Sequence, residues 1–269
     1  MRLLAISDLH LGHPANRDRL SSIGASPEDW LILAGDVGET EAHLTLAFEH
    51  LTSRFAKLIW VPGNHELWTV EQSPKNLRGK TRYEALVALA RRFGVITPED
   101  PYPEWPQGDR PMTIVPLFTL YDYSFRPDEV PLDRVIEWAA QDGVACADEF
   151  LLHPEPYRDR AAWCAARVAA TEARLTALPE SVGTILVSHF PLFRSHAKLP
   201  RVPRFSPWCG TRATETWTDR FRAHAVIYGH LHIRRSFEER GVQFHEVSLG
   251  YPGQWDQKHG MASYLRVIL

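Results

Sequence analysis

The sequence predicts an α/β fold built around a largely parallel sheet. Several short apolar runs have the length of buried strands, and polar residues and glycine follow them directly. Helical patterns separate the first three runs, and strands that alternate with helices favour parallel pairing, with loops that carry ligands at the carboxyl ends of the strands. The predicted strands are residues 3–7, 30–34, 58–61, 184–187 and 225–228.

The other elements follow from local pattern. Helices are expected near residues 39–54, 80–94 and 158–178, while residues 98–111, rich in Pro, Trp and acidic side chains, are typical of a surface loop. Residues 113–121 predict another buried strand. Residues 234–248 alternate around Arg240-Gly241 as in a hairpin, and residues 262–269 are expected to close a sheet. We expect a single domain, 1–269, with a middle excursion at roughly 70–180.

Composition narrows the class of protein. The 269 residues are 44% hydrophobic and 23% charged, as in an ordinary globular protein. A net charge of −3 argues against duplex nucleic acid as a partner. Three widely separated cysteines without a CxxC spacing predict free thiols in a reducing compartment. The N-terminus lacks a signal-peptide core, and no apolar run approaches the roughly 18 residues of a membrane span. We therefore expect a cytoplasmic protein with no membrane partner; its oligomeric state is left open.

Residues suited to metal binding follow five of the predicted strands. They combine carboxylate or amide oxygens with imidazoles and contain no cysteine, a set that suits Mn²⁺ or Fe, with Zn²⁺ as an alternative. Side chains two residues apart on an extended segment point the same way, so each D-x-H or H-x-H pair is expected to serve one site. The segments are Asp8-Leu9-His10, Gly35-Asp36, Gly63-Asn64-His65, Ser188-His189 and Gly229-His230-Leu231-His232.

The ordered set D-x-H, GD, GNHE, H and GHxH resembles the signature of calcineurin-like metallophosphoesterases, and it spans most of the chain. The resemblance implies a four-layer αββα sandwich of two mixed sheets flanked by helices, and a binuclear metal-dependent phosphoesterase. By position it implies one metal held by Asp8, His10, Asp36 and His232, and a second held by Asp36, Asn64, His189 and His230. It also implies that Asp36 bridges the metals and that His65 stands beside the leaving group.

The chemistry expected of such a pair is hydrolysis of a phosphate ester. Two ions about 3.5 to 4 Å apart neutralise charge on the phosphate and acidify a bridging water, which attacks phosphorus as hydroxide. His65 is the expected proton donor to the departing oxygen, so His65 and Asp36 are the predicted catalytic residues. Taken singly, each predicted metal ligand is of a residue type that more often forms a turn, a helix cap or part of the core. The metal-site prediction depends on the occurrence of all of them in the order of the family signature. We expect Glu66 to be only a cap.

Two other segments are candidates for substrate binding. The loop after the first ligand pair contains His13 and Asn16 and is expected to overhang the substrate. The segment 194–212, which we call the basic loop, contains Arg201 and Arg204 among six basic side chains and no carboxylate. It is expected to attract an anionic substrate or an acidic protein. The alternative is a solvated loop that balances acidic stretches elsewhere.

The substrate class is narrowed by smaller details. Residues 37–40, Val-Gly-Glu-Thr, lack the Asp-Arg-Gly pattern of the Ser/Thr protein phosphatases, which disfavours that activity. Residues 208–211 and 248–252 resemble a bacterial subgroup that includes 4′-phosphopantetheinyl hydrolases, enzymes that remove the pantetheine arm from acyl carrier proteins. The resemblance implies a phosphodiester or phosphomonoester substrate and an acidic carrier protein as partner. The alternatives are a cyclic nucleotide or nucleotide phosphodiesterase, a nuclease, and a scaffold that has lost its metals.

Overall fold

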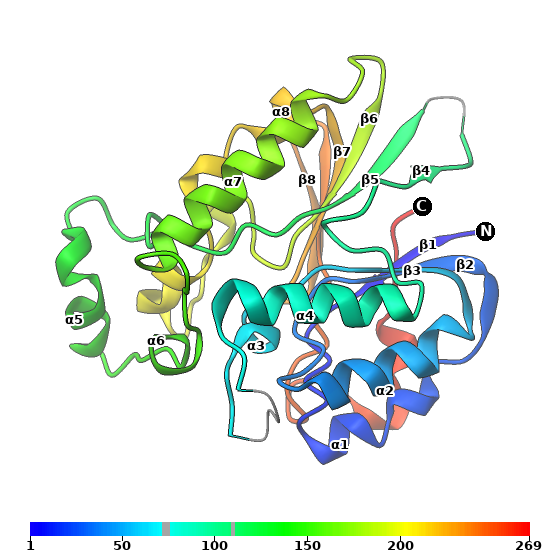
Figure 1. Cartoon of the computed structure of the whole chain (residues 1–269), viewed down its shortest axis with the longest axis horizontal. Helices are drawn as coiled ribbons and strands as arrows, with labels where there is room; N and C mark the ends of the chain where they lie inside the picture. The colour runs from blue at the N-terminus through cyan, green and yellow to red at the C-terminus, as the bar shows by residue number, and fades with distance from the viewer. Residues whose placement is uncertain (72–75, 109–110) are drawn as a thin grey trace.

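The computed structural model describes residues 1–71, 76–108 and 111–269. Two mixed β-sheets pack against each other in this part of the chain, and helices cover their outer sides (Figure 1). The arrangement confirms the αββα sandwich. None of the helices in the described residues is long and apolar enough to cross a membrane.

The first sheet has the order β10-β1-β2-β3. Strands β1, β2 and β3 are parallel, and β10 lies antiparallel to β1 at the edge, which brings the two termini together (Figure 1). The bounds are β1 Leu3–Ile6, β2 Ser26–Leu33, β3 Phe55–Trp60 and β10 Arg266–Val267.

The second sheet has the order β4-β5-β6-β7-β9-β8. Its central strands are parallel, whereas β4 and β8 pair antiparallel at the two edges. The bounds are β4 Glu104–Trp105, β5 Met112–Pro116, β6 Gly183–Val187, β7 Ala223–Tyr228, β8 Arg235–Glu239 and β9 Val242–Glu246.

Strand residues alternate between two apolar clusters. One cluster combines Leu3 and Ala5 of the first sheet with Ile185 and Val187 of the second, so it fills the space between the sheets. The intervening residue Leu4 belongs to the other cluster, which packs against the helices. Both faces of the central strands are therefore buried, which explains why these strands are uniformly apolar in the sequence.

The helices pack onto the sheets through one apolar side. In α2 the residues Leu44, Ala47, Phe48 and Leu51 are buried, the spacing of a helix with one buried face. Thr40 caps α2 and Asp159 caps α7 through side-chain acceptors. The bounds are α1 Pro14–Arg17, α2 Glu41–Thr52, α3 Asn64–Leu67, α4 Gly79–Arg92, α5 Val135–Ala140, α6 Asp148–Leu151, α7 Arg160–Thr176 and α8 Trp217–Arg220.

Three expected elements differ from the structure. The strand expected over 113–121 ends at Pro116; the residues after it stay apolar because they pack under α7, where the rings of Phe118 and Trp163 lie 5.5 Å apart. The last strand is short because residues 261–264 form a 3₁₀ helix. The segment 98–111, expected as a loop, includes β4, whose Trp105 packs on Trp30; residues 109–110 lie outside the described part.

The range 70–180, expected as an excursion, contributes β4, β5 and α7 to the sandwich. Its residues 72–75 and 109–110 lie outside the described part. The division of the chain into domains stays a prediction.

The two sheets join at the carboxyl ends of β1 and β9. Ser7 forms a parallel bridge with Ser248, and the backbone of Asp8 accepts from Gly250 at 3.1 Å. The loops that follow the parallel strands therefore meet at one edge of the sandwich.

Candidate metal centre

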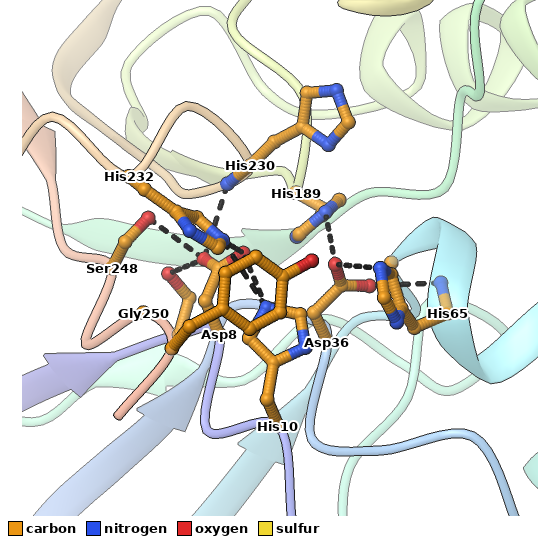
Figure 2. A network of polar contacts seen from close by, with 12 residues as sticks. Asp8, His10, Asp36, His65, His189, His230, His232, Ser248 and Gly250 are labelled. Carbon is orange, nitrogen blue, oxygen red and sulfur yellow. Dashed lines mark hydrogen bonds and ion pairs between the residues drawn. The ribbon is translucent and has the colours of Figure 1, made fainter. Parts of the chain in front are cut away.

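The predicted metal ligands gather at this edge, in the loops that follow β1, β2, β3, β6 and β7 (Figure 2). Asp8, His10 and His232 offer ligand atoms within 4.8 Å of one another. The same holds for Asp36, His189 and His230, and for His10, Asp36 and His65. The first two groups match the two predicted ligand sets, apart from Asn64, and Asp36 lies beside both His10 and His189.

The ligand loops adopt a backbone conformation that the sequence pattern did not predict. Asp8, His10, Asp36, His230 and His232 all have left-handed φ angles, between 44° and 70°. The D-x-H and H-x-H side chains therefore converge through left-handed turns, and our expectation that they lie on extended segments was wrong. Non-glycine residues in this region cost conformational energy and cluster at functional sites.

Two glycines beside the predicted ligands are required because other parts of the cluster pack closely against them; one of them also has a positive φ angle. Gly35 has a φ of +90°, and a Cβ there would lie 2.5 Å from Nδ1 of His189. At Gly63 φ is ordinary, but a Cβ would overlap the carboxylate of Asp36. These two glycines let the loops after β2, β3 and β6 approach one another.

Hydrogen bonds orient two of the imidazoles toward the cluster. Nδ1 of His189 lies 2.9 Å from the carbonyl oxygen of Ala34, and Nδ1 of His232 lies 2.7 Å from Oε1 of Gln254. Because both partners are acceptors, Nδ1 carries a proton in each ring, and Nε2 faces a carboxylate of the cluster, Asp36 for His189 and Asp8 for His232. Nε2 of His232 lies 3.0 Å from Oδ1 of Asp8 and 3.1 Å from Nε2 of His10.

Asn64 is oriented by Asp148, a residue that the sequence analysis did not single out. Nδ2 of Asn64 donates to Oδ1 of Asp148 at 2.9 Å, and Nε1 of Trp68 donates to the same oxygen at 2.6 Å. Asp148 is fully buried, and burial raises the pKa of its carboxyl. The contact leaves Oδ1 of Asn64 without a partner among the described residues.

Several buried atoms of the cluster lack a partner among the described residues. They include Oδ1 of Asn64, Nδ1 of His10 and Nε2 of His230. Buried polar atoms are nearly always hydrogen-bonded, and oxygens and imidazole nitrogens that converge on one place are the donor set of transition-metal ions. The residues present therefore fit a metal centre.

Charge within the cluster supports the same interpretation. Burial opposes ionisation of Asp8 and Asp36, but the neighbouring histidines outweigh it and lower the pKa of both carboxyls. Burial lowers the pKa of His10 and His230 to about 3, so both imidazoles are neutral at pH 7. Burial also opposes the charged form of His189, but Asp36 and Asp8 raise its pKa to about 10. The carboxylates thus draw a cation into the site.

Glu66, expected only as a cap, also links two ligand loops. Its carboxylate accepts from the backbone N–H of Asp36 at 2.9 Å, of Val37 at 2.8 Å and of Gly63 at 2.9 Å. Glu66 is fully buried. It therefore fixes the loop after β2 against the loop after β3, and capping was only part of its role.

His65 lies at the edge of the cluster, opposite His232 (Figure 2). Its Nδ1 is 3.2 Å from Oε1 of Glu39, and its ring lies on Trp68 with centroids 3.7 Å apart. Burial lowers the pKa of His65, but the carboxylates of Asp36 and Glu39 outweigh it, so the net shift is upward. Glu39 was missed in the sequence because only its place three residues after Asp36 marks it.

The predicted substrate residues are scattered. His13 is exposed and meets the edge of Tyr251, whose ring stacks on His10 with centroids 4.4 Å apart. Asn16 is fully buried, and its amide bonds to Leu9, Gly250 and Trp255, so the structure gives it a packing role instead of substrate contact.

The two arginines of the basic loop that were predicted to bind substrate also differ from each other. Arg201 is exposed and lines a cavity beside His232. Arg204 bonds to the carbonyl oxygen of Trp138 and lies over its ring, 4.9 Å from the centroid. Its guanidinium is therefore directed at α5, and a role of Arg204 in substrate binding stays a prediction.

Comparison with known proteins agrees with this geometry. The chain is 48% identical over 269 residues to "[Acyl-carrier-protein] phosphodiesterase PptH" of Mycobacterium tuberculosis, with 99% of this chain and 83% of that protein covered. The crystal structure of phosphopantetheinyl hydrolase PptH from Mycobacterium tuberculosis superposes with a TM-score of 0.95 and 48% identity, covering 100% of this chain and 95% of the other.

A dimetal phosphatase from Danio rerio, 14% identical with a TM-score of 0.51, covers 92% of this chain and 87% of its own, and shows the fold alone. The sequence model that describes calcineurin-like phosphoesterases matches residues 1–234. With this match and the near full-length likeness above, the chain belongs to the calcineurin-like phosphoesterase family and is a metal-dependent phosphoric ester hydrolase.

Proposed function

We propose that this enzyme is a phosphodiesterase that releases 4′-phosphopantetheine from holo-acyl carrier protein. The observation that carries the proposal is the 48% identity to a phosphopantetheinyl hydrolase along nearly the whole chain. The ligand cluster supports it, because every residue that the family signature requires is present at one edge of the sandwich. The reaction breaks the bond between phosphorus and the serine oxygen of the carrier and adds water across it.

The proposed ligands divide into two sets that share Asp36. Asp8, His10, Asp36 and His232 would hold one metal, and Asp36, Asn64, His189 and His230 would hold the other. Mn²⁺ and Fe suit this mixture of oxygens and imidazoles, and Zn²⁺ is the alternative. The metal pair, when bound, neutralises phosphate charge and activates water.

Side chains of the protein are proposed to orient the metal ligands and to protonate the leaving group. Glu66 and Asp148 hold the ligand loops, so that Asp36 and Asn64 keep their orientation when substrate arrives. His65 gives a proton to the departing serine oxygen. Its contact with Glu39 favours the imidazolium form and fixes which nitrogen faces the substrate.

The acidic carrier protein is proposed to meet the exposed part of the basic loop. Several cations there already have carboxylate partners: Arg194 and Arg212 pair with Asp128, and His196 pairs with Glu239. Arg201 is exposed, with no carboxylate partner recorded in the described residues. Lys198 is exposed as well, with no ion pair recorded in the described residues, so the attraction is proposed to come from Arg201 and Lys198.

We also propose a cytoplasmic location. Cys146, Cys164 and Cys209 are all buried and free, as expected where thiols stay reduced. The test of the function is a metal-supplemented screen of purified enzyme against holo-acyl carrier protein, bis-p-nitrophenyl phosphate, cyclic nucleotides and a phosphoprotein. We expect release of 4′-phosphopantetheine, seen by mass spectrometry as conversion of the holo to the apo carrier. Faster turnover of a cyclic nucleotide or phosphoprotein than of the carrier would refute the assignment.

A further inference from the structure

Two cavities lie near the metal-ligand cluster: one is lined by Glu39, which contacts His65, and the other is lined by His232 itself. His65 and His232 lie at opposite ends of the cluster (Figure 2). The cavity near His65 has a volume of about 630 Å³ and carries Glu39 and Glu41 in its wall. The cavity near His232 has a volume of about 600 Å³. Both volumes fall within the roughly 300 to 1,000 Å³ of ordinary ligand pockets. A phosphodiester carries two organic groups on its phosphorus, and the enzyme has one cavity toward each end of the cluster.

The cavity near His232 is lined by residues 199–202, 231–233 and 253–254, and we call it the His232 groove. Its wall is mostly apolar, with Leu199, Val202 and Ile233 contributing side chains from the basic loop and from the loop after β7. Arg201 and Gln254 supply hydrogen-bond donors within this apolar surface.

We propose that the His232 groove binds the pantetheine arm of the substrate; this inference rests on the proposed function. Beyond its phosphate, the arm is uncharged and thin, with a dimethyl-substituted carbon followed by two amides. An apolar wall with a few fixed donors fits that sequence of groups, because the wall covers the methyl groups and the donors meet amide carbonyls. The groove includes the ligand His232 itself, so an arm within it ends at the metals.

Gln254 is held in place for such a contact. Its Oε1 accepts from Nδ1 of His232 and from the backbone N–H of Tyr251, both at 2.7 Å. Because Oε1 is engaged twice, Nε2 points away from these two donors, and no acceptor for it is recorded in the described residues. Its N–H groups are therefore free to donate to an amide of the arm.

The direction of the reaction distinguishes the two cavities. His65 protonates the serine oxygen, so the carrier serine lies at the His65 end of the cluster. The arm stays on phosphorus after cleavage and must leave the cluster by another route. The cavity near His65 carries two carboxylates, and their charge disfavours a phosphate that enters deeply on that side. The groove near His232 carries none among its described residues.

The test replaces residues of the groove wall by tryptophan and measures how strongly 4′-phosphopantetheine inhibits each variant. Val202 is 44% exposed, so Val202→Trp is expected to fold and to occupy the groove. Ile233→Trp is a second variant in the same wall. Val267→Trp is the matched control, since Val267 is 51% exposed and belongs to edge strand β10. The assay measures the hydrolysis of bis-p-nitrophenyl phosphate in the presence of either free 4′-phosphopantetheine or inorganic phosphate. The Ki of each compound is determined for every variant, and the two Ki values are compared.

In the groove variants the Ki of 4′-phosphopantetheine is expected to rise about 10- to 100-fold, as when a pocket contact is lost, with little change in the Ki of phosphate. The control keeps both values. Equal rises in both Ki values would overturn the inference, because the damage would then lie at the metals. A higher KM for holo-carrier with an unchanged Ki of 4′-phosphopantetheine would also overturn it and assign the groove to the carrier protein.

The experiments distinguish failure of the proposed function from failure of the inference about the His232 groove. If the wild-type enzyme does not cleave holo-carrier, the proposed function fails. A selective rise in the Ki of 4′-phosphopantetheine in the groove variants would still support the groove.

Discussion

Replacement of Asp148 by alanine tests how the metal centre is held. The Asp148 carboxylate accepts from Nδ2 of Asn64 and from Nε1 of Trp68 inside the protein. Asp148→Ala leaves the buried amide of Asn64 and the indole N–H of the half-buried Trp68 without that acceptor. Each buried donor left unsatisfied costs about 1 to 3 kcal/mol, so we expect the free energy of unfolding to fall by about 2 to 6 kcal/mol.

The larger consequence concerns the metal that Asn64 is proposed to hold. Loss of a hydrogen bond that orients a ligand typically lowers metal affinity or activity about 10- to 100-fold. Asp8, His10 and His232 make no recorded contact with Asp148, so the metal that they are proposed to hold should keep its affinity. We therefore expect Asp148→Ala to lose one of two metals first.

The assay is metal content per protein after dialysis against increasing chelator, with circular dichroism to establish that the variant is folded. Asp148→Asn is the matched control, because its Oδ1 can still accept from Asn64 and Trp68. It should lose far less affinity than the alanine variant. A folded Asp148→Ala protein that keeps both metals at wild-type affinity, or loses both together, would refute the reasoning.

Four further predictions use the same site. Asp36→Asn should abolish hydrolysis and lower occupancy of both metals; retention of two ions in elemental analysis would contradict a bridging role. His65→Ala should keep both metals and slow esters with poor leaving groups much more than nitrophenyl esters, which need less help from a proton donor; equal loss on both would exclude that role. Glu39→Gln should move the alkaline limb of the kcat profile to lower pH, because Glu39 raises the pKa of His65 and the active, protonated form is lost as pH rises through that pKa; an unmoved limb would separate Glu39 from catalysis. Arg201→Ala should raise KM for holo-carrier more at low salt than at high salt, with a small diester unaffected; Arg204→Ala, whose guanidinium is engaged by α5, is the control.

The ligand cluster could be predicted from the sequence because its parts are local. Each ligand follows an apolar run directly, and the carboxyl ends of parallel strands meet at one edge of a sheet, so residues as distant as Asp8 and His230 are brought together. The αββα architecture was not accessible in this way. Whether strands form one sheet or two depends on packing between faces, which a run of apolar residues does not encode.

The supporting residues escaped prediction for a different reason. Asp148 comes from α6, which no motif marks, and it reaches Asn64 only because the chain between them folds back over 84 positions. The buried role of Asn16 was missed because its three partners lie in separate segments. The end of β5 was predicted too late because the residues after Pro116 are buried and apolar. Such residues have the same composition whether they continue a strand or pack under a helix.

The proposed metal ligands come from both sheets. Asp8, Asp36 and Asn64 follow strands of the first sheet, whereas His189 and His230 follow strands of the second. A metal pair held by both would act as a cross-link between the two halves of the sandwich. Ions at 100 times their dissociation constant add about 2.7 kcal/mol to the free energy of unfolding for each independent site. Chelators should therefore lower the melting temperature as well as the activity, and the metal supply of the cell would set how long the enzyme survives.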